Sequence, residues 1–145
     1  MWKEMLTAAW LLPMSAMDIR RRQVPAWMLL LGTAAAVVVL VSEGWSGGLS
    51  VWRICKAVIP GIVLLVIAGL TGRAGYADGI VLLLLGLLAG YEICLTASLG
   101  GLFLIALCSG VLLALRKVKR DTRMPFLPFL AVGWLAAVCG RCGLI

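Results

Sequence analysis

Residues 72–79 read GRAGYADG and separate two runs that are almost entirely aliphatic, residues 57–70 and residues 80–89. Neither run contains a charged residue, so the break places the carboxylate of Asp78 at the mouth of a long apolar segment. A carboxylate beside hydrocarbon is costly and needs a structural or functional reason. The three glycines of the break indicate tight turning and close approach of the backbone, and not a solvated linker.

One other acid, Asp18, has a comparable setting. It lies in the segment SAMDIR, residues 15–20, where the first apolar run meets a basic cluster that continues to Arg22. An acid in this position also needs a reason, since it stands beside an apolar segment. We therefore predict that Asp18 and Asp78 work as a pair.

The composition is that of an integral membrane protein. The chain has 145 residues, of which 63% are hydrophobic and 13% are charged, and its mean hydropathy is +1.12. A soluble domain averages about half apolar and about a quarter charged residues. Nearly every stretch between charge clusters is apolar, which leaves no room for a separate soluble domain. The sequence predicts a single all-α transmembrane domain over residues 1–145, a polytopic membrane protein with about six transmembrane helices.

Charge and side-chain chemistry narrow the function. The formal net charge is +7, but the charges sit in short loops beside apolar runs, which is typical of topology determinants and lipid-headgroup contacts. No basic stripe interleaved with aromatic residues is present, so nucleic acid is not predicted as a partner. Histidine is absent, which excludes Ser-His and Cys-His nucleophile pairs and every metal site that contains histidine.

The cysteines give no sign of a metal site. Five are present, and only Cys139 and Cys142 have the CxxC spacing. No second CxxC pair completes a zinc site, so we interpret the cysteines as small apolar residues and leave a disulfide near the C-terminus open. Neither a metal nor another cofactor is predicted.

The apolar runs predict six helices. Pro25 and Pro125 are each expected in the first turn of a helix, because proline is favourable there. Residues 43–50 are expected to form a polar, glycine-rich loop, and residues 51–54 to lie along the membrane surface. The predicted helices span residues 1–18, about 24–41, about 56–70, 80–89, about 93–115 and about 125–139.

The distribution of basic residues orients these helices. Nine of them fall on one side, at positions 20–22, at position 73 and within residues 116–123, whereas Lys3, Arg53, Lys56 and Arg141 fall on the other. The positive-inside rule places the larger group in the cytoplasm. Two whole crossings separate Asp18, at the end of the first helix, from Asp78, at the start of the fourth. Both aspartates are therefore expected at the cytoplasmic face.

Two carboxylates held close in a partly dry site do not both ionise cheaply, so one keeps a proton while the other is charged. The charged one can take a proton from a water that attacks a peptide carbonyl. The protonated one can donate to the carbonyl oxygen and then to the leaving amine. This chemistry needs no histidine, metal or nucleophilic serine. Which aspartate holds the proton stays open at this point, because the titration belongs to the pair.

Other interpretations of the aspartates stay open. Asp18 can form an interfacial ion pair with the neighbouring arginines, and Asp78 can cap the fourth helix, because aspartate is a preferred N-cap. A small proton- or ion-coupled transporter would use intramembrane acids as a relay, although both acids are expected at one face and no inverted repeat is visible. A non-catalytic scaffold for a membrane assembly has no positive sign in the sequence.

Three blocks of sequence carry a resemblance to a known family. The first is Asp18 in the tripeptide DIR, followed by VP at residues 24–25. The second is GYAD at residues 75–78, and the third is MPFLPFLA at residues 124–131. In order, spacing and six-helix layout they resemble the type IV prepilin peptidases and preflagellin peptidases, membrane aspartic proteases of the GxGD type, over essentially the whole chain.

The resemblance implies an endopeptidase that cuts the short, basic leader from pilin-like precursors, just ahead of their hydrophobic helix. It implies that Asp18 and Asp78 are the catalytic pair and that Gly75 lets the chain bend beside the substrate backbone. Ala77 stands in place of the second glycine of the motif. The resemblance also implies that three prolines lie near the site and have a structural role. These are Pro25, Pro125 and Pro128.

The resemblance also implies a location and a subclass. The expected partners are a prepilin-like protein substrate and the lipid bilayer, in the inner (plasma) membrane of a prokaryote, with several membrane crossings and the site facing the cytoplasm. The chain lacks the cysteine-containing N-terminal region of the larger, bifunctional members. We therefore expect peptidase activity without methyltransferase activity, as in the short enzymes of tight-adherence (Flp) pili.

Overall fold

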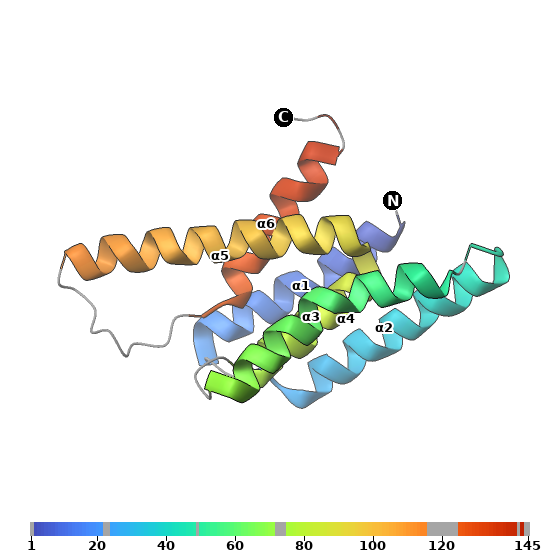
Figure 1. Ribbon diagram of the computed structural model, residues 1–145, viewed down its shortest axis with the longest axis horizontal. Coiled ribbons are helices and arrows are strands. Elements are labelled where there is room, and N and C mark those ends of the chain that lie inside the picture. Colours follow the sequence, from blue (N-terminus) through green and yellow to red (C-terminus); the bar gives the residue numbers. More distant parts are fainter. Residues whose placement is uncertain are drawn as a thin grey trace.

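The computed structural model describes residues 2–21, 24–48, 50–71, 75–115, 125–141 and 143. Within these residues every regular element is a helix, in agreement with the predicted all-α class (Figure 1). The six helices of the described residues are α1 (Trp2–Arg21), α2 (Ala26–Trp45), α3 (Val51–Thr71), α4 (Tyr76–Ala89), α5 (Tyr91–Ala114) and α6 (Leu127–Arg141).

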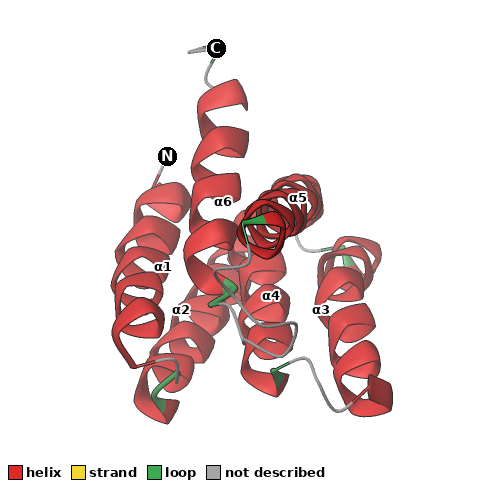
Figure 2. Cartoon of the chain, turned by 90° about the vertical axis from the view of Figure 1, so that its left-hand side faces the viewer, coloured by secondary structure: helices red, strands yellow, loops and turns green. Residues whose placement is uncertain are grey.

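Helix α4 lies in the middle of the bundle. It packs most extensively against α3 and also contacts α1, α2 and α5, and Figure 2 shows it between α2 and α3. After its first turn its sequence is almost entirely aliphatic, as expected for a helix with neighbours on every side. Its buried residues are Gly79, Val81, Leu82, Leu84, Leu85, Gly86 and Leu88. The helix that carries Asp78 is thus held by four others.

Helices α1 and α6 pack against each other, and α1 also contacts α4. Their fully buried side chains form one cluster, made by Leu11 and Met14 of α1, Leu85 and Leu88 of α4, and Leu127 and Leu130 of α6. Contacts of this kind stabilise the packing of membrane helices through van der Waals attraction. This cluster fixes the start of α6 beside the last turns of α1.

Glycine allows α3 and α4 to approach closely. A side chain at Gly86 would overlap the carbonyl oxygen of Ala57 on α3, and a Cβ at Gly61 would lie 2.5 Å from the Cα of Leu83 on α4. The two facing helices therefore touch through their backbones, a contact that small residues permit in membrane bundles.

The outward faces of the longest helices are apolar. Among the described residues, α2, α3 and α5 are long and apolar enough to cross a membrane. Exposed aliphatic and aromatic side chains such as Val38, Ile62 and Phe103 cover them, and such a surface is suited to lipid. Helices α4 and α6, with 14 and 15 residues, span about 21–23 Å, less than the hydrocarbon core of about 30 Å. The membrane class is supported, whereas the count of six crossings stays a prediction.

Both aspartates lie inside helical turns, which corrects the predicted helix bounds. The first helix does not end at Asp18 but continues to Arg21, and α4 begins at Tyr76 instead of residue 80. Arginines in the last turn of α1 and Asp78 in the first turn of α4 each complement the helix dipole. These favourable charges extend the helices into segments that hydropathy alone assigns to loops.

The end of α2 and the start of α3 also shift outward. Helix α2 continues to Trp45, and residues 51–54 belong to α3 and do not lie flat on the surface. The amides of Arg53 and Ile54 both donate to the carbonyl of Ser50 and so start this helix. The predicted basic loop at residues 116–123 lies outside the described residues, as does Cys142.

Candidate active site

The ends of three helices meet at one end of the bundle. Asp18 is in the last turn of α1, Asp78 is the third residue of α4, and α6 begins beside them at Leu127 (Figure 1). The carboxyl groups of Asp18 and Asp78 are close enough that the negative charge of Asp18 raises the pKa of Asp78. Neither aspartate belongs to one of the three long apolar helices of the described chain. The structure thus brings together the two acids that the sequence singled out.

Asp18 is buried, with only 6% of its surface exposed. Its Oδ2 atom accepts a hydrogen bond from the backbone N–H of Leu127 at 3.3 Å. Leu127 is the first residue of α6, so Asp18 occupies the position of an anion at a helix N-terminus, where amides without a helical partner and the helix dipole favour negative charge. Burial raises the pKa of Asp18 above its ordinary value of 3.8, and the bond from Leu127 opposes that rise.

Asp78 is half-buried in the first turn of α4, just after its N-cap residue Gly75. Its backbone N–H donates to the carbonyl of Gly75 at 3.1 Å. Burial, and then the charge of Asp18, raise the pKa of Asp78 to about 6. The two effects have the same sign, because both disfavour a second negative charge in a site with little water.

Gly75 provides room for the Asp78 carboxyl group. Its backbone is extended, with φ −73° and ψ 125°, a conformation open to any residue. A Cβ at this position would instead lie 2.9 Å from Oδ2 of Asp78. The close neighbour of this glycine is thus the aspartate side chain of its own helix, and the predicted approach of a substrate backbone stays a prediction.

Among the described residues, the remaining predicted residues make no hydrogen bond to either carboxyl group. Ala77 is half-buried in the first turn of α4. Pro25 is the N-cap residue of α2, with its carbonyl accepting from the amide of Met28 at 3.0 Å. Pro125 stands two residues before α6, and Pro128 is the second residue of α6. The prediction that Pro25 and Pro125 lie in a first helical turn is therefore off by one and two positions.

One part of the site is missing from the sequence-based prediction. The amide that binds Asp18 belongs to the backbone of Leu127, which lies between Pro125 and Pro128. A backbone amide leaves no side-chain signature. The available signal was the proline at residue 128, because proline is favoured near a helix start and so indicates where amides without a helical partner are found.

The described residues contain no group of three or more histidine, cysteine, aspartate or glutamate side chains that could hold a metal ion. The chemistry available at this end of the bundle is that of two carboxyl groups with unequal surroundings. Such a pair can exchange protons with a water molecule and with a polar substrate group placed between them.

A family model matches most of the chain. It is described as the type IV leader peptidase family, and it covers residues 5–116 of 145. The matched region contains Asp18, Gly75 and Asp78 and ends before α6. No curated protein and no solved structure matches the chain.

Proposed function

Because the chain belongs to the type IV leader peptidase family, we propose that it is a membrane aspartic endopeptidase for pilin-like precursors. In this proposal it removes their leader peptide at the cytoplasmic membrane face, and the precursors are of the tight-adherence (Flp) type. Asp18 and Asp78 activate the attacking water. One observation carries the mechanism: the two carboxyl groups interact at the same end of the bundle, although 60 positions separate them in the sequence.

The two carboxyl groups have different surroundings, and this suggests their roles. Asp18 accepts the Leu127 amide at the start of α6, which stabilises its ionised form. The pKa of Asp78 is raised to about 6 by burial and by the charge of Asp18. We therefore assign the base to Asp18 and the single proton of the pair to Asp78.

The reaction then proceeds in two steps. Ionised Asp18 takes a proton from water as the water oxygen bonds to the scissile carbonyl carbon, while Asp78 gives its proton to the carbonyl oxygen. Asp18, now protonated, donates to the leaving nitrogen as the carbon–nitrogen bond breaks, and the proton on the carbonyl oxygen returns to Asp78 as the new carboxyl group forms. The pair ends in its starting protonation state, so no cofactor is consumed.

The cytoplasmic face is proposed from the charge distribution. Arg20 and Arg21 lie in the last turn of α1, beside the aspartates. In the sequence, Arg73 lies between α3 and α4, and residues 116–123, with five more basic residues, lie between α5 and α6. Arg20 and Arg21 lie at the same end of α1 as Asp18, and the positive-inside rule assigns an end that carries such basic residues to the cytoplasm.

The proposal is tested with the purified chain in liposomes and a synthetic precursor that has a short basic leader before a hydrophobic helix. Mass spectrometry of the products should show one cut, just ahead of the hydrophobic helix. A pH-sensitive dye inside the same liposomes reports proton flux. An active preparation that moves protons through the aspartates but leaves the precursor intact would contradict the proposal and favour a transporter.

Gly75→Ala is expected to lower kcat by about ten- to a hundredfold, because a small displacement of a reacting group has effects of this size. The new Cβ would lie 2.9 Å from Oδ2 of Asp78 and push the carboxyl group aside. The backbone conformation at residue 75 accepts alanine, so the thermal midpoint should change little. The measurement is the initial rate of leader cleavage together with the melting curve.

Gly69→Ala provides the matched control, because a Cβ at Gly69 on α3 meets no atom within 4 Å. It should keep the parental rate of cleavage. Equal rates for Gly75→Ala and Gly69→Ala would show that the carboxyl group of Asp78 does not need its position.

The rate of cleavage is expected to depend on pH in a bell shape. Asp78 must keep its proton, so kcat/KM should fall by about tenfold per pH unit as the pH rises through its pKa of about 6. Asp18 must be ionised, so the rate should also fall in acid, toward a pKa above the ordinary value of 3.8. Both limbs belong to the coupled pair. A rate that stays constant across and above pH values near 6 would contradict the raised pKa as a feature of the mechanism.

A further inference from the structure

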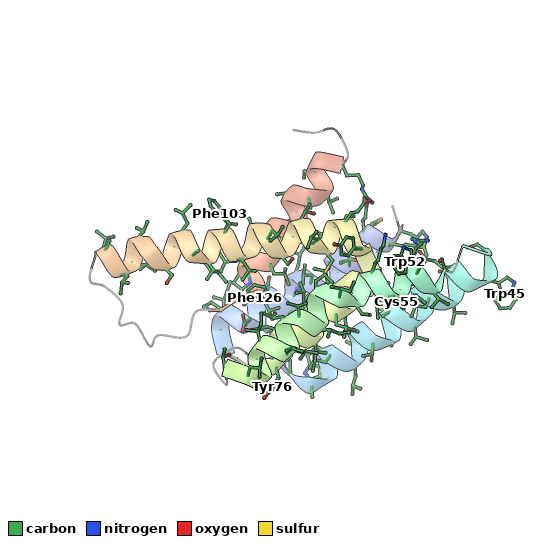
Figure 3. The ribbon with its side chains drawn as sticks, viewed as in Figure 1. Trp45, Trp52, Cys55, Tyr76, Phe103 and Phe126 are labelled. Atoms are coloured by element: carbon green, nitrogen blue, oxygen red, sulfur yellow. The ribbon has the colours of Figure 1, made fainter. Side chains whose placement is uncertain are left out.

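A second polar site lies at the end of the bundle opposite the aspartates. A cavity of about 450 Å³ opens there between the starts of α1, α3 and α5 and the ends of α2, α4 and α6. Figure 3 shows Trp52 and Cys55, near the start of α3, well apart from Tyr76 at the start of α4. The charged residues that line the cavity are Lys3, Arg53, Lys56, Arg141, Glu43 and Glu92.

The lining carries four positive and two negative charges, a net charge of +2. Glu43 forms ion pairs with Lys3 and, at 3.6 Å, with Arg53. Glu92 pairs with Arg141 at 3.1 Å. Among the described residues, Lys56 has no carboxylate within 4 Å. The two carboxylates thus leave positive charge in the cavity unmatched.

The helix dipoles do not compensate this charge. Three helices begin at this end of the bundle and three end there, so their positive and negative ends cancel to a first approximation. The side chains therefore decide the sign of the potential, and the cavity favours an anion.

Three exposed tryptophans lie at this end of the bundle. Trp2, Trp45 and Trp52 are exposed by 50%, 91% and 68% respectively, and exposed tryptophans near an apolar surface are typical of the membrane–water interface. The Nζ atom of Lys56 lies 5.1 Å from the ring centroid of Trp52. An aromatic ring beside an unmatched ammonium group, above apolar helix faces, suits a ligand with an anionic head and an apolar tail.

We propose that this cavity binds the phosphate of an anionic phospholipid headgroup, with Lys56 as its main cationic contact and the acyl chains along the apolar faces of α2 and α3. The cavity contains neither Asp18 nor Asp78, which lie at the other end of the bundle. Lipid binding at this cavity therefore does not require that the chain is a peptidase. Its ligand chemistry, a phosphate group, is shared with free inorganic phosphate, and the experiment separates the two sources.

The test uses the full chain in a neutral detergent and measures binding by native mass spectrometry. The three probes are short-chain phosphatidylglycerol, phosphatidylcholine of the same chain length, and inorganic phosphate. Phosphatidylglycerol should bind most tightly. Lys56→Gln should weaken that binding by about fivefold, the effect expected for one basic residue near a membrane surface, and Lys56→Arg should restore it. Glu92→Gln should tighten binding, because it releases Arg141 from its ion pair.

Arg21→Gln is the matched control, because it removes one positive charge at the opposite end of the bundle. It should leave phosphatidylglycerol binding within about twofold of the parent, since its charge is screened at that distance. An equal loss in Arg21→Gln and Lys56→Gln would show unspecific attraction and overturn the site. Inorganic phosphate or phosphatidylcholine binding as tightly as phosphatidylglycerol would overturn its assignment to an anionic lipid. Circular dichroism of each variant verifies that the helices are retained.

Discussion

Asp78→Asn is expected to lower kcat for leader cleavage by about a thousandfold, within the range that proton transfer by a positioned side chain contributes. Asparagine keeps the shape of the side chain in the first turn of α4 but cannot hold or deliver the proton that the proposed mechanism assigns to Asp78. The substrate contacts stay in place, so KM should change little. The measurement is single-turnover cleavage in liposomes, with products quantified by mass spectrometry.

Glu4→Gln is the control for this variant. It makes the same kind of chemical change at a half-buried acid in the first turn of α1, far along the bundle from the aspartate pair. Its cleavage rate should stay within about twofold of the parent, since surface substitutions usually have small effects. If Asp78→Asn cleaves as fast as Glu4→Gln, the acid role of Asp78 is wrong.

Asp18→Asn and Asp18→Ala are expected to separate the two tasks of Asp18. Both should lower kcat by about a thousandfold, because neither can take a proton from water. Only alanine removes the oxygen that accepts the Leu127 amide at the start of α6. Loss of a cap of this kind destabilises a protein by about 1 kcal/mol, so Asp18→Ala should melt at a lower temperature than Asp18→Asn.

The melting curves and the cleavage rates are measured on the same preparations. Equal stability of the alanine and asparagine variants would show that the bond from Leu127 does not hold α6. A cleavage rate near that of the parent in Asp18→Asn, with the fold intact, would remove Asp18 from the mechanism.

The sequence predicted the parts of the candidate site that consist of acidic side chains. Two acids bordering apolar runs stood out because carboxylates are rare there, and the structure brings Asp18 and Asp78 together. The helix ends were less predictable. The predicted first helix ends at Asp18, whereas the favourable charges of the last turn carry α1 to Arg21. Hydropathy likewise misses the first turn of α4, since Asp78 reads as polar but stabilises a helix start.

Backbone groups and tertiary cavities have no side-chain signature of their own in the sequence, although Pro128 indicates where α6 begins. The Leu127 amide acts through its position at the start of α6, and a leucine in an apolar segment gives no hint of it. The cationic cavity gathers Lys3, Arg53, Lys56 and Arg141 from three helices. In the sequence analysis these residues were used only to orient the chain in the membrane. The cavity was not predicted, because the distances between these residues depend on how the helices pack.

The contact between Asp18 and α6 also extends the site beyond the region of the family match. That match ends at residue 116, whereas the amide that stabilises the ionised form of Asp18 belongs to residue 127. The prolines on either side of Leu127 restrict the backbone that presents this amide. We therefore regard the start of α6 as a positioning element for the base.

The central claim is that Asp18 and Asp78 act as one unit on a single water molecule. It is tested most directly by single-turnover cleavage of one pilin-like precursor by the parent, Asp18→Asn, Asp78→Asn and the double variant, in the same liposomes. When two residues act as one catalytic unit, removing both lowers the rate little more than removing one. The double variant should therefore cleave within about threefold of the slower single variant. Losses that multiply in the double variant, or a single variant that keeps the parental rate, would contradict the account.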